Sequence, residues 1–228
     1  MGHQLAEIDD VLSGAVDRAV DRFILVQLGA RYGNYVSKAA RFLNERRPGL
    51  ESTLIAVEAS PVGFESLMAK MRNWGLETPP NQFLNLAISD RYESVEFTET
   101  GAGSHFIQDK EDPAAENVYV VQTTTIDNIL ADLTHVDFLE MDIQGAEYKS
   151  VRASLESINR KVKLICVRTH WPPREEEELA KMFSSLGWKE VINMENGAEI
   201  AIAGEPQKLV DGIQCWANEK LCEGAEAR

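Results

Sequence analysis

The sequence lacks the features that mark a membrane-spanning, a secreted or a nucleic-acid-binding protein. No apolar stretch approaches the length needed to cross a bilayer, so we expect no membrane partner. Glu7, Asp9 and Asp10 stand where a secretory signal peptide needs positive charge. Only 23 Lys and Arg residues oppose 37 Asp and Glu residues, which gives a formal net charge of −14. A chain this acidic gains nothing from counterion release on a phosphate backbone, so we expect no nucleic-acid partner.

Cysteine is also scarce. The three cysteines, Cys166, Cys215 and Cys222, are odd in number, and their spacing fits neither a metal site nor a disulfide framework. Cys166 lies in an apolar run, which predicts a small buried core residue. We therefore expect reduced cysteines and a cytoplasmic protein. Internal repeats and low-complexity segments are absent from the sequence as well.

What the sequence does contain is an alternation of strand-like and helix-like segments within 228 residues, which suits one α/β domain. Nearly continuous apolar runs predict buried strands at 23–28, 53–58, 83–88, 136–141 and 162–167. Apolar residues at helical spacing predict helices with buried faces at 5–19, 36–43, 64–71, 126–130, 151–158 and 179–186. This order predicts a parallel sheet with helices on both faces.

The domain organisation follows from the same pattern. We expect a leading helix within 1–22, one domain over 23–217 and a polar, loose tail over 218–228. The alternation breaks between 90 and 122, where we expect an insertion with a small hairpin or flap. Segments 188–192 and 200–203, joined by a turn at Glu195-Asn196-Gly197, predict two closing strands in a hairpin.

Two strand ends carry residues that suit a nucleotide. Residues 29–33 (GARYG) follow the first strand, and glycine there allows a tight turn and a close approach of the backbone to a ligand. Glu58 ends the second strand, where a carboxylate can accept hydrogen bonds from both ribose hydroxyls. A bare strand-to-helix turn and a solvated acid are the alternatives. Together the two features indicate an adenosyl nucleoside or a dinucleotide.

A third group of polar residues follows the fourth and fifth strands. Glu140 and Asp142 share a strand face, which places Asp142 at the carboxyl edge of the sheet. Glu147 begins the next helix and can point back to that edge, and His170 after the fifth strand can serve as a base or ligand. The alternatives are helix capping by Asp142, a dipole interaction of Glu147 and an exposed structural histidine.

Four blocks, in order, resemble the FkbM-like methyltransferases: 28–33, 57–61, 85–90 and 137–147, with 124–127 in place before the last. The similarity runs from about residue 23 to about residue 170. It implies a Rossmann-like class I methyltransferase fold, an α/β architecture whose seven-stranded, mostly parallel sheet has an antiparallel last strand and helices on both faces. It also implies S-adenosyl-L-methionine as the cofactor.

The resemblance assigns residues to the cofactor by motif position. Its predicted contacts are Gly29, Ala30 and Gly33 at the methionine end, Glu58 and Ala59 at the ribose, Ala87 and Ile88 at the adenine, and Asp142 near the methyl donor. The chain departs from the family at three positions. Gln27 stands where the family often has an acid, but it can still hydrogen-bond the amino-acid end of the cofactor. Arg31 replaces an asparagine, and Gln144 replaces a glutamate, which weakens a metal site, so none is predicted.

Family members typically methylate oxygens of sugars or secondary metabolites, so the resemblance implies a small-molecule or sugar acceptor. Asp142 and His170 are the candidate bases for a hydroxyl acceptor, with Glu147 as a helper. We expect the acceptor to contact Gln144 and a lid that contains Ser104 and His105.

Two other functions stay open. A nicotinamide-dependent oxidoreductase would share the glycine turn and the ribose acid, although the turn is not the full three-glycine fingerprint and the 140–147 block has no role there. The departures at Gln27 and Gln144 also leave room for a degenerate methyltransferase fold that binds a cofactor without catalysis.

Overall fold

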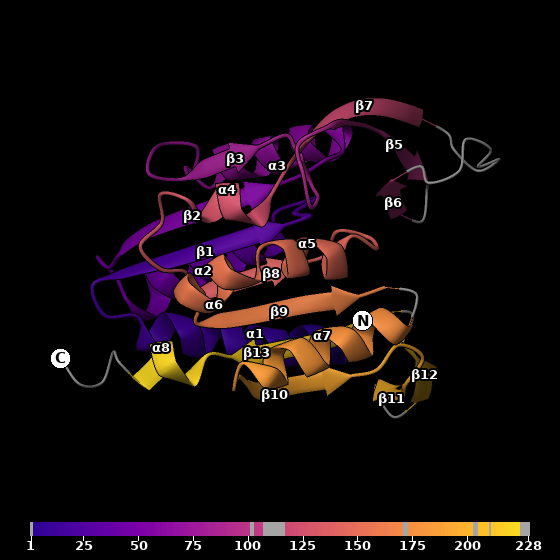
Figure 1. Cartoon of the computed structure of the whole chain (residues 1–228). Coiled ribbons are helices and arrows are strands. Elements are labelled where there is room, and N and C mark those ends of the chain that lie inside the picture. Colours follow the sequence, from indigo (N-terminus) through magenta and orange to yellow (C-terminus); the bar gives the residue numbers. More distant parts are fainter. Residues whose placement is uncertain are drawn as a thin grey trace.

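The computed structural model of the chain describes residues 2–100, 103–106, 117–170, 173–202, 205–209 and 211–223. A seven-stranded sheet in the order β10-β13-β9-β8-β1-β2-β3 forms its centre (Figure 1). Its strands are β1 (Arg22–Leu28), β2 (Glu51–Val57), β3 (Gln82–Leu84), β8 (Phe138–Met141), β9 (Leu164–Thr169), β10 (Lys189–Met194) and β13 (Gly212–Ala217). Neighbours from β3 to β9 run parallel, whereas β13 runs antiparallel to both β9 and β10. The predicted mostly parallel sheet with an antiparallel last strand is confirmed.

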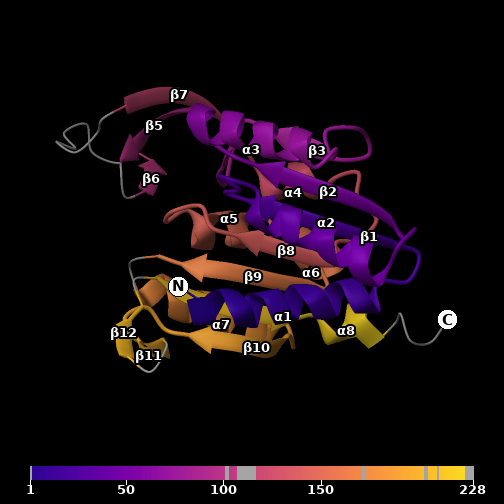
Figure 2. The same ribbon diagram turned by 180° about the vertical axis from the view of Figure 1, so that it is seen from behind.

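Helices cover both faces of this sheet. One face carries α1 (Gly2–Arg18), α2 (Asn34–Arg46) and α3 (Pro61–Asn73), which lie in front in Figure 2. The other carries α4 (Ile126–Leu130), α5 (Glu147–Ala153), α6 (Leu155–Lys161) and α7 (Pro173–Ser185), in front in Figure 1. In β1, Phe23 and Leu25 pack in the core on the side of α1, α2 and α3. Ile24 and Val26 pack in the core on the side of α4 to α7. Because alternate side chains enter separate cores, the strand is a nearly continuous apolar run.

Serine side chains set two helix boundaries. Ser60 caps α3, because its Oγ accepts a hydrogen bond of 2.9 Å from the Gly63 amide, and Pro61 occupies the first helical position. The single helix predicted around 151–158 is wrong, since Ser154 leaves the helical conformation between α5 and α6. The buried Ser154 hydroxyl instead accepts a hydrogen bond of 3.1 Å from the Asp127 amide at the start of α4.

The predicted closing hairpin is also wrong. The turn at Glu195-Asn196-Gly197 exists, but β10 pairs with β13 rather than with the segment at 200–203. That segment instead contributes to a separate two-stranded sheet of β11 (Glu199–Ile202) and β12 (Glu205–Lys208). The sequence hides β13 because Gln214 interrupts its apolar run. The buried Gln214 amide is satisfied by donating a hydrogen bond of 2.9 Å to the Glu176 carbonyl oxygen in α7.

The strand expected at 83–88 divides between two sheets. Gln82–Leu84 forms β3, and β4 (Ala87–Ile88) begins a four-stranded sheet in the order β4-β7-β5-β6. The other strands of that sheet are β5 (Ser94–Thr100), β6 (Gly103–Phe106) and β7 (Asn117–Thr124). At the division, the Asn85 amide donates to the carbonyl oxygens of Glu58 and Ala59. The described residues between 90 and 122 therefore form more sheet than the small hairpin or flap expected there.

The expectation of reduced cysteines is wrong for two of the three. Cys166 in β9 and Cys215 in β13 lie opposite each other and form a disulfide, whereas Cys222 is free and half-buried. The two residues are 49 positions apart in the sequence, and only the unpredicted pairing of β9 with β13 brings them together. The expected burial of Cys166 is confirmed.

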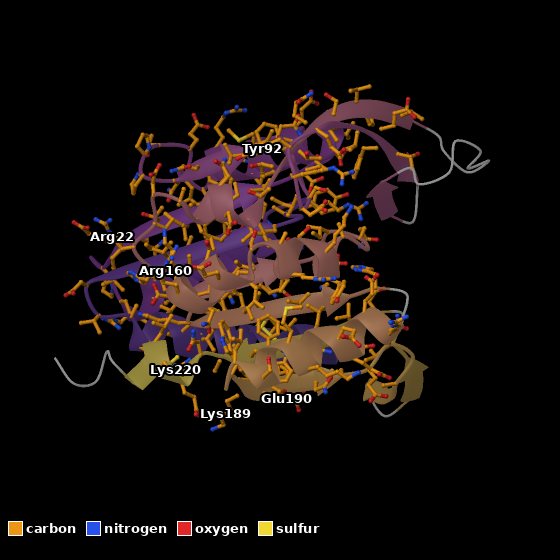
Figure 3. All side chains as sticks on the ribbon, viewed as in Figure 1. Arg22, Tyr92, Arg160, Lys189, Glu190 and Lys220 are labelled. Atoms are coloured by element: carbon orange, nitrogen blue, oxygen red, sulfur yellow. A yellow bond between two sulfur atoms is a disulfide. The ribbon has the colours of Figure 1, made fainter. Side chains whose placement is uncertain are left out.

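The start of the C-terminal segment is ordered, not loose as expected. Residues 219–223 form the short helix α8 (Glu219–Glu223), and the Asn218 side chain before it donates to the Asn159 carbonyl oxygen. Among the described residues, no helix is both long enough and apolar enough to span a membrane. Arg22, labelled in Figure 3, begins β1 and marks the amino edge of the sheet. The candidate functional residues lie at the opposite edge.

Candidate functional site

The two glycines of the first turn are explained by close packing. Gly29 has a φ of 79°, and a Cβ there would clash with the carbonyl oxygen of Asp142. Gly33 has a φ of 62°, and its Cβ would clash with Leu67 and Met71 of α3. Ala30 between them is buried. Glycine thus lets the loop after β1 contact the loop after β8, and these are the loops predicted to surround the methionine end of a cofactor.

Glu58 organises the neighbouring turn. Its side chain is buried, its Oε1 accepts from the Ser60 amide (2.8 Å), and its Oε2 accepts from the Arg31 amide (2.6 Å). Arg31 has a φ of 45°, a left-handed conformation that is unfavourable for a residue with a Cβ. Glu58 therefore holds this turn in place. A carboxylate oxygen has two acceptor sites, so the same group can also accept from ribose hydroxyls.

The residues predicted at the adenine lie beyond Glu58. Ala87 and Ile88 form β4 and are buried, where they pair with Thr123 and Thr124 of β7. Ala59 is partly buried and packs against the cluster that contains Ala87. The structure thus places these three residues next to the Glu58 turn, at the base of the four-stranded sheet.

Gln27 and Glu140 are opposite each other on β1 and β8, and both are buried. The Gln27 Oε1 accepts from the Val36 amide in the first turn of α2 (3.3 Å). Burial and, to a smaller extent, the nearby carboxylate of Asp142 raise the pKa of Glu140 to about 8. The Glu140 Oε2 has no hydrogen-bond partner among the described residues.

The structure brings Asp142, Glu147, Gln144 and His170 together. The His170 Nδ1 lies 2.9 Å from the Glu147 Oε1, and its Nε2 lies 3.4 Å from the Asp142 Oδ1. The Gln144 Nε2 lies 2.8 Å from both the Asp142 Oδ1 and the His170 Nε2. Burial lowers the pKa of His170, but its hydrogen bond to Glu147 and the surrounding carboxylates outweigh burial and raise it.

Glu147 also organises the loop that precedes it. Its Oε1 accepts from the Ile143 amide and its Oε2 from the Gly145 amide, each at 2.9 Å. The residue between them, Gln144, has a φ of 58°. Helix α5 begins after Ala146 and has no side-chain cap, so Asp142 is not a helix cap. The alternative interpretation of Asp142 as a helix cap is therefore wrong.

Two residues of the cluster were missed by the sequence analysis. The Arg168 Nε lies 3.3 Å from the Asp142 Oδ2, and the Asp211 Oδ1 lies 3.8 Å from the His170 Nε2. Arg168 precedes His170 by two positions, and strand periodicity could have placed both on one face. Asp211 directly precedes β13, and no signal could have found it because β13 itself was not predicted.

The predicted lid residues lie in the four-stranded sheet. The backbone of Ser104 and His105 belongs to β6, where they pair with Glu99 and Thr98 of β5. Their side chains lie outside the described residues, so their contact with an acceptor stays a prediction. Figure 1 shows β5, β6 and β7 extending beyond the carboxyl ends of the parallel strands, and the β11–β12 hairpin beyond the same edge near α7.

Comparison with known proteins identifies the family. Residues 27–196 match the family model described as the methyltransferase FkbM domain, which is most of the chain. The chain belongs to the FkbM methyltransferase family. The match supports the methyltransferase interpretation of the glycine turn and Glu58 over the oxidoreductase one.

A relative and two solved structures agree with this assignment. A protein of Jannaschia sp. (strain CCS1) named "Putative methyltransferase" is 28% identical over 210 residues, covering 87% of this chain and 74% of that protein. The methyltransferase FkbM of Methylobacillus flagellatus KT has a TM-score of 0.56 at 11% identity over 86% of this chain and 44% of its own. The precorrin-6y C5,15-methyltransferase of Geobacter metallireducens GS-15 has a TM-score of 0.51 at 10% identity, covering 92% and 87%. At these identities the solved structures show a shared fold.

Proposed function

We propose that this protein transfers the methyl group of S-adenosyl-L-methionine to a hydroxyl oxygen of a small molecule or sugar. The observation that carries the proposal is the meeting of two loops at the carboxyl edge of the sheet. The glycine turn after β1 contacts the loop after β8 at Asp142, and the cluster of Asp142, Glu147 and His170 lies at that contact. Ligands of open α/β sheets bind at this edge.

The cofactor would lie across the ends of β1, β2 and β4. Gly29, Ala30 and Gly33 would face its methionine end, with Gln27 beneath them in the sheet. Glu58 and Ala59 would meet the ribose. Ala87 and Ile88, which lie next to that turn, would flank the adenine.

Methyl transfer moves one carbon from sulfur to oxygen. The carbon–sulfur bond breaks with its electron pair left on sulfur, the oxygen–carbon bond forms, and the hydroxyl proton is lost. Much of the rate of such a displacement comes from alignment of the oxygen with the methyl group. Asp142, His170 and Glu147 would hold the acceptor oxygen and promote loss of its proton, while Gln144, Ser104 and His105 would contact the rest of the acceptor.

A small, neutral or polyhydroxylated acceptor suits the charge of the chain. The net charge of −14 disfavours a nucleic-acid acceptor, because phosphate groups would be repelled. A cofactor-binding fold without catalysis is the alternative outcome of the tests below.

The test is calorimetric titration of the protein with S-adenosylmethionine, S-adenosylhomocysteine and NAD, each alone. We expect micromolar binding of both adenosyl ligands and none of NAD. Glu58→Gln should weaken that binding at least about tenfold, because it removes the charge from the carboxylate that would accept the ribose hydroxyls, and a loss of about 1.4 kcal/mol is a factor of ten. Glu51→Gln is the matched control at the amino end of the same strand, and it should bind as the wild type does.

The second half of the test follows tritium from the methyl group of S-adenosylmethionine into a panel of free monosaccharides and polyhydroxylated metabolites. Transfer that is lost in Asp142→Asn supports the proposal. Binding of NAD alone would overturn it, and cofactor binding with no transfer to any acceptor would point to the non-catalytic alternative.

A further inference from the structure

We propose that Asp142, His170 and Asp211 bind a divalent transition-metal cation, with Gln144 as a fourth ligand. The three side chains come from separate parts of the chain: after β8, after β9 and before β13. They meet at the carboxyl edge, where the proposed acceptor would lie. The site itself does not depend on the proposed function, but its role in methyl transfer rests on it.

The separations of the donor atoms suit a shared cation. The His170 Nε2 lies 3.4 Å from the Asp142 Oδ1 and 3.8 Å from the Asp211 Oδ1. Ligand atoms about 2.1 Å from one cation are about 3.0 to 3.4 Å apart in octahedral and tetrahedral sites. The Asp142–His170 pair already has this spacing, and the Asp211 carboxylate would have to move closer to complete the set around an ion.

His170 is oriented as metal-binding histidines are. Its Nδ1 is 2.9 Å from the Glu147 Oε1, which leaves Nε2 to face Asp142 and Asp211. Glu147 is itself buried and held by the amides of Ile143 and Gly145. A carboxylate behind a histidine in this way fixes the ring and its tautomer and strengthens the opposite nitrogen as a ligand.

The Arg168 guanidinium orients Asp142 from the side away from His170. The Arg168 Nε lies 3.3 Å from the Asp142 Oδ2, so the Oδ1 is the oxygen that faces His170. Asp142 and Asp211 are about one-third exposed, at 30% and 33% of their side chains, which leaves a route for an ion from solvent. Both carboxylates are thus accessible, and the Oδ1 of Asp142 is directed at His170.

Gln144 already places a polar group between two of these ligands. Its amide nitrogen is 2.8 Å from both the Asp142 Oδ1 and the His170 Nε2, and its backbone is held in the left-handed region to reach them. A strained backbone at a ligand cluster is a common feature of functional sites. Rotation of the amide about its last bond would bring Oε1 to the same place as a neutral oxygen ligand.

The charges around the cluster also favour a bound cation. Asp142, Asp211 and Glu147 supply three carboxylates, against Arg168 and a histidine that is neutral when it binds a metal. Behind Asp142, the buried Glu140 carboxyl has an oxygen without a hydrogen-bond partner among the described residues. Because an imidazole joins oxygen ligands here, a first-row transition metal such as Mn²⁺ or Zn²⁺ fits better than Ca²⁺. Such an ion would bind the acceptor hydroxyl and lower its pKa.

The test uses Mn²⁺ alone as the probe, added to the full chain after treatment with a chelator. Calorimetry and the electron paramagnetic resonance of free Mn²⁺ should show one saturable site per chain in the micromolar range. Pulsed resonance spectra of the bound ion should show one directly coordinated nitrogen, which disappears in His170→Ala.

Variants locate the site. Asp211→Asn and His170→Ala should each weaken Mn²⁺ binding at least about tenfold, and Glu147→Gln about 10- to 100-fold although it removes no ligand atom. Asp132→Asn, an exposed carboxylate in the turn after α4, is the control and should bind as the wild type does. Thermal melts report folding, and the part-exposed position of Asp211 keeps the test valid if His170→Ala does not fold.

No saturable binding, binding without a nitrogen ligand, or binding unchanged in Asp211→Asn would overturn the proposal. Titration of the same samples with S-adenosylmethionine separates the two proposals. Mn²⁺ binding without cofactor binding would remove the methyl-transfer role and leave the cation site, and cofactor binding without Mn²⁺ binding would do the reverse.

Discussion

The two ends of strand β8 carry buried carboxyl groups with opposite electrostatic environments. Asp137 precedes the strand and accepts from the Ile24 amide and the Lys163 ammonium, each at 2.8 Å, with His135 at 3.2 Å. Burial raises the pKa of Asp137, but these partners outweigh burial and lower it. Three positions later, burial and the nearby Asp142 raise the pKa of Glu140 to about 8. Both side chains are at most 3% exposed, so their partners, not their burial, decide the difference.

The difference indicates that the amino end of β8 serves stability and the carboxyl end serves function. At the amino edge the Ile24 amide, Lys163 and His135 are all complementary to the Asp137 carboxylate, which is the arrangement that stabilises a fold. At the carboxyl edge, carboxylates are close to one another and one buried oxygen has no partner among the described residues. Perturbed groups of this kind gather at functional sites, where stability is given up for chemistry.

The largest expected effect is at Asp137, at the amino end of β8. Asp137→Asn removes the charge that Lys163 faces, and we expect the free energy of unfolding to fall by about 3 kcal/mol. That figure is at the low end for a buried pair, because Lys163 keeps partial contact with water. Urea unfolding measures it, with Asp132→Asn as the exposed control. A loss below about 1 kcal/mol would show that the Asp137 partners are not stabilising.

The lowered pKa of Asp137 also predicts that the stability of the fold depends on pH. Because the pKa of Asp137 is lowered in the folded state, it contributes stability above its ordinary value of 3.8 and loses it as pH falls through the folded value. The gap in unfolding free energy between wild type and Asp137→Asn should therefore shrink as pH falls below about 4. A gap that stays constant from neutral pH into that range would contradict the assignment.

A smaller effect of opposite sign is expected at the carboxyl end. Glu140→Gln replaces a buried carboxyl by a neutral amide of the same shape, and we expect the protein to become more stable by about 1 kcal/mol. Thermal unfolding near neutral pH in the presence of a chelator measures this change. If Glu140→Gln destabilises the fold as Asp137→Asn does, the two ends of β8 do not differ in the way described.

An effect of about the same small size concerns Arg31, which Glu58 holds in a left-handed conformation. Glycine adopts this conformation freely, whereas any Cβ disfavours it by about 1 kcal/mol. Arg31→Gly should therefore be more stable than Arg31→Ala by about that amount, although both lose the same charge. Equal melting temperatures for the two variants would show that the turn relaxes when the side chain is removed.

Local patterns predicted most of the fold and failed where distant pairing decides. The runs at 23–28 and 53–58 are apolar because both faces of β1 and β2 are buried, so the sequence shows them directly. β13 could not be found because Gln214 interrupts its apolar run, and the acceptor of the Gln214 side-chain amide is a carbonyl oxygen 38 positions away. The Cys166–Cys215 disulfide and Asp211 depend on that strand and were missed with it.

The candidate site follows the same rule. Strand ends predicted that Asp142, Glu147 and His170 would approach one edge, and the structure brings these side chains together. Their individual roles stay predictions. The hydrogen bond from Glu147 to His170 and the closure of the group by Asp211 depend on the relative positions of three strands, which no local pattern contains.

The disulfide between β9 and β13 has a consequence for the integrity of the chain. It joins two residues 49 positions apart, and α7, β10 and the β11–β12 hairpin all lie between them. A protease that cuts one peptide bond anywhere in that interval opens a ring without releasing a fragment. The nicked protein would therefore keep its full mass until a reductant separates the two pieces, and His170 and Asp211, which lie just inside the crosslink, would stay tethered across the cut.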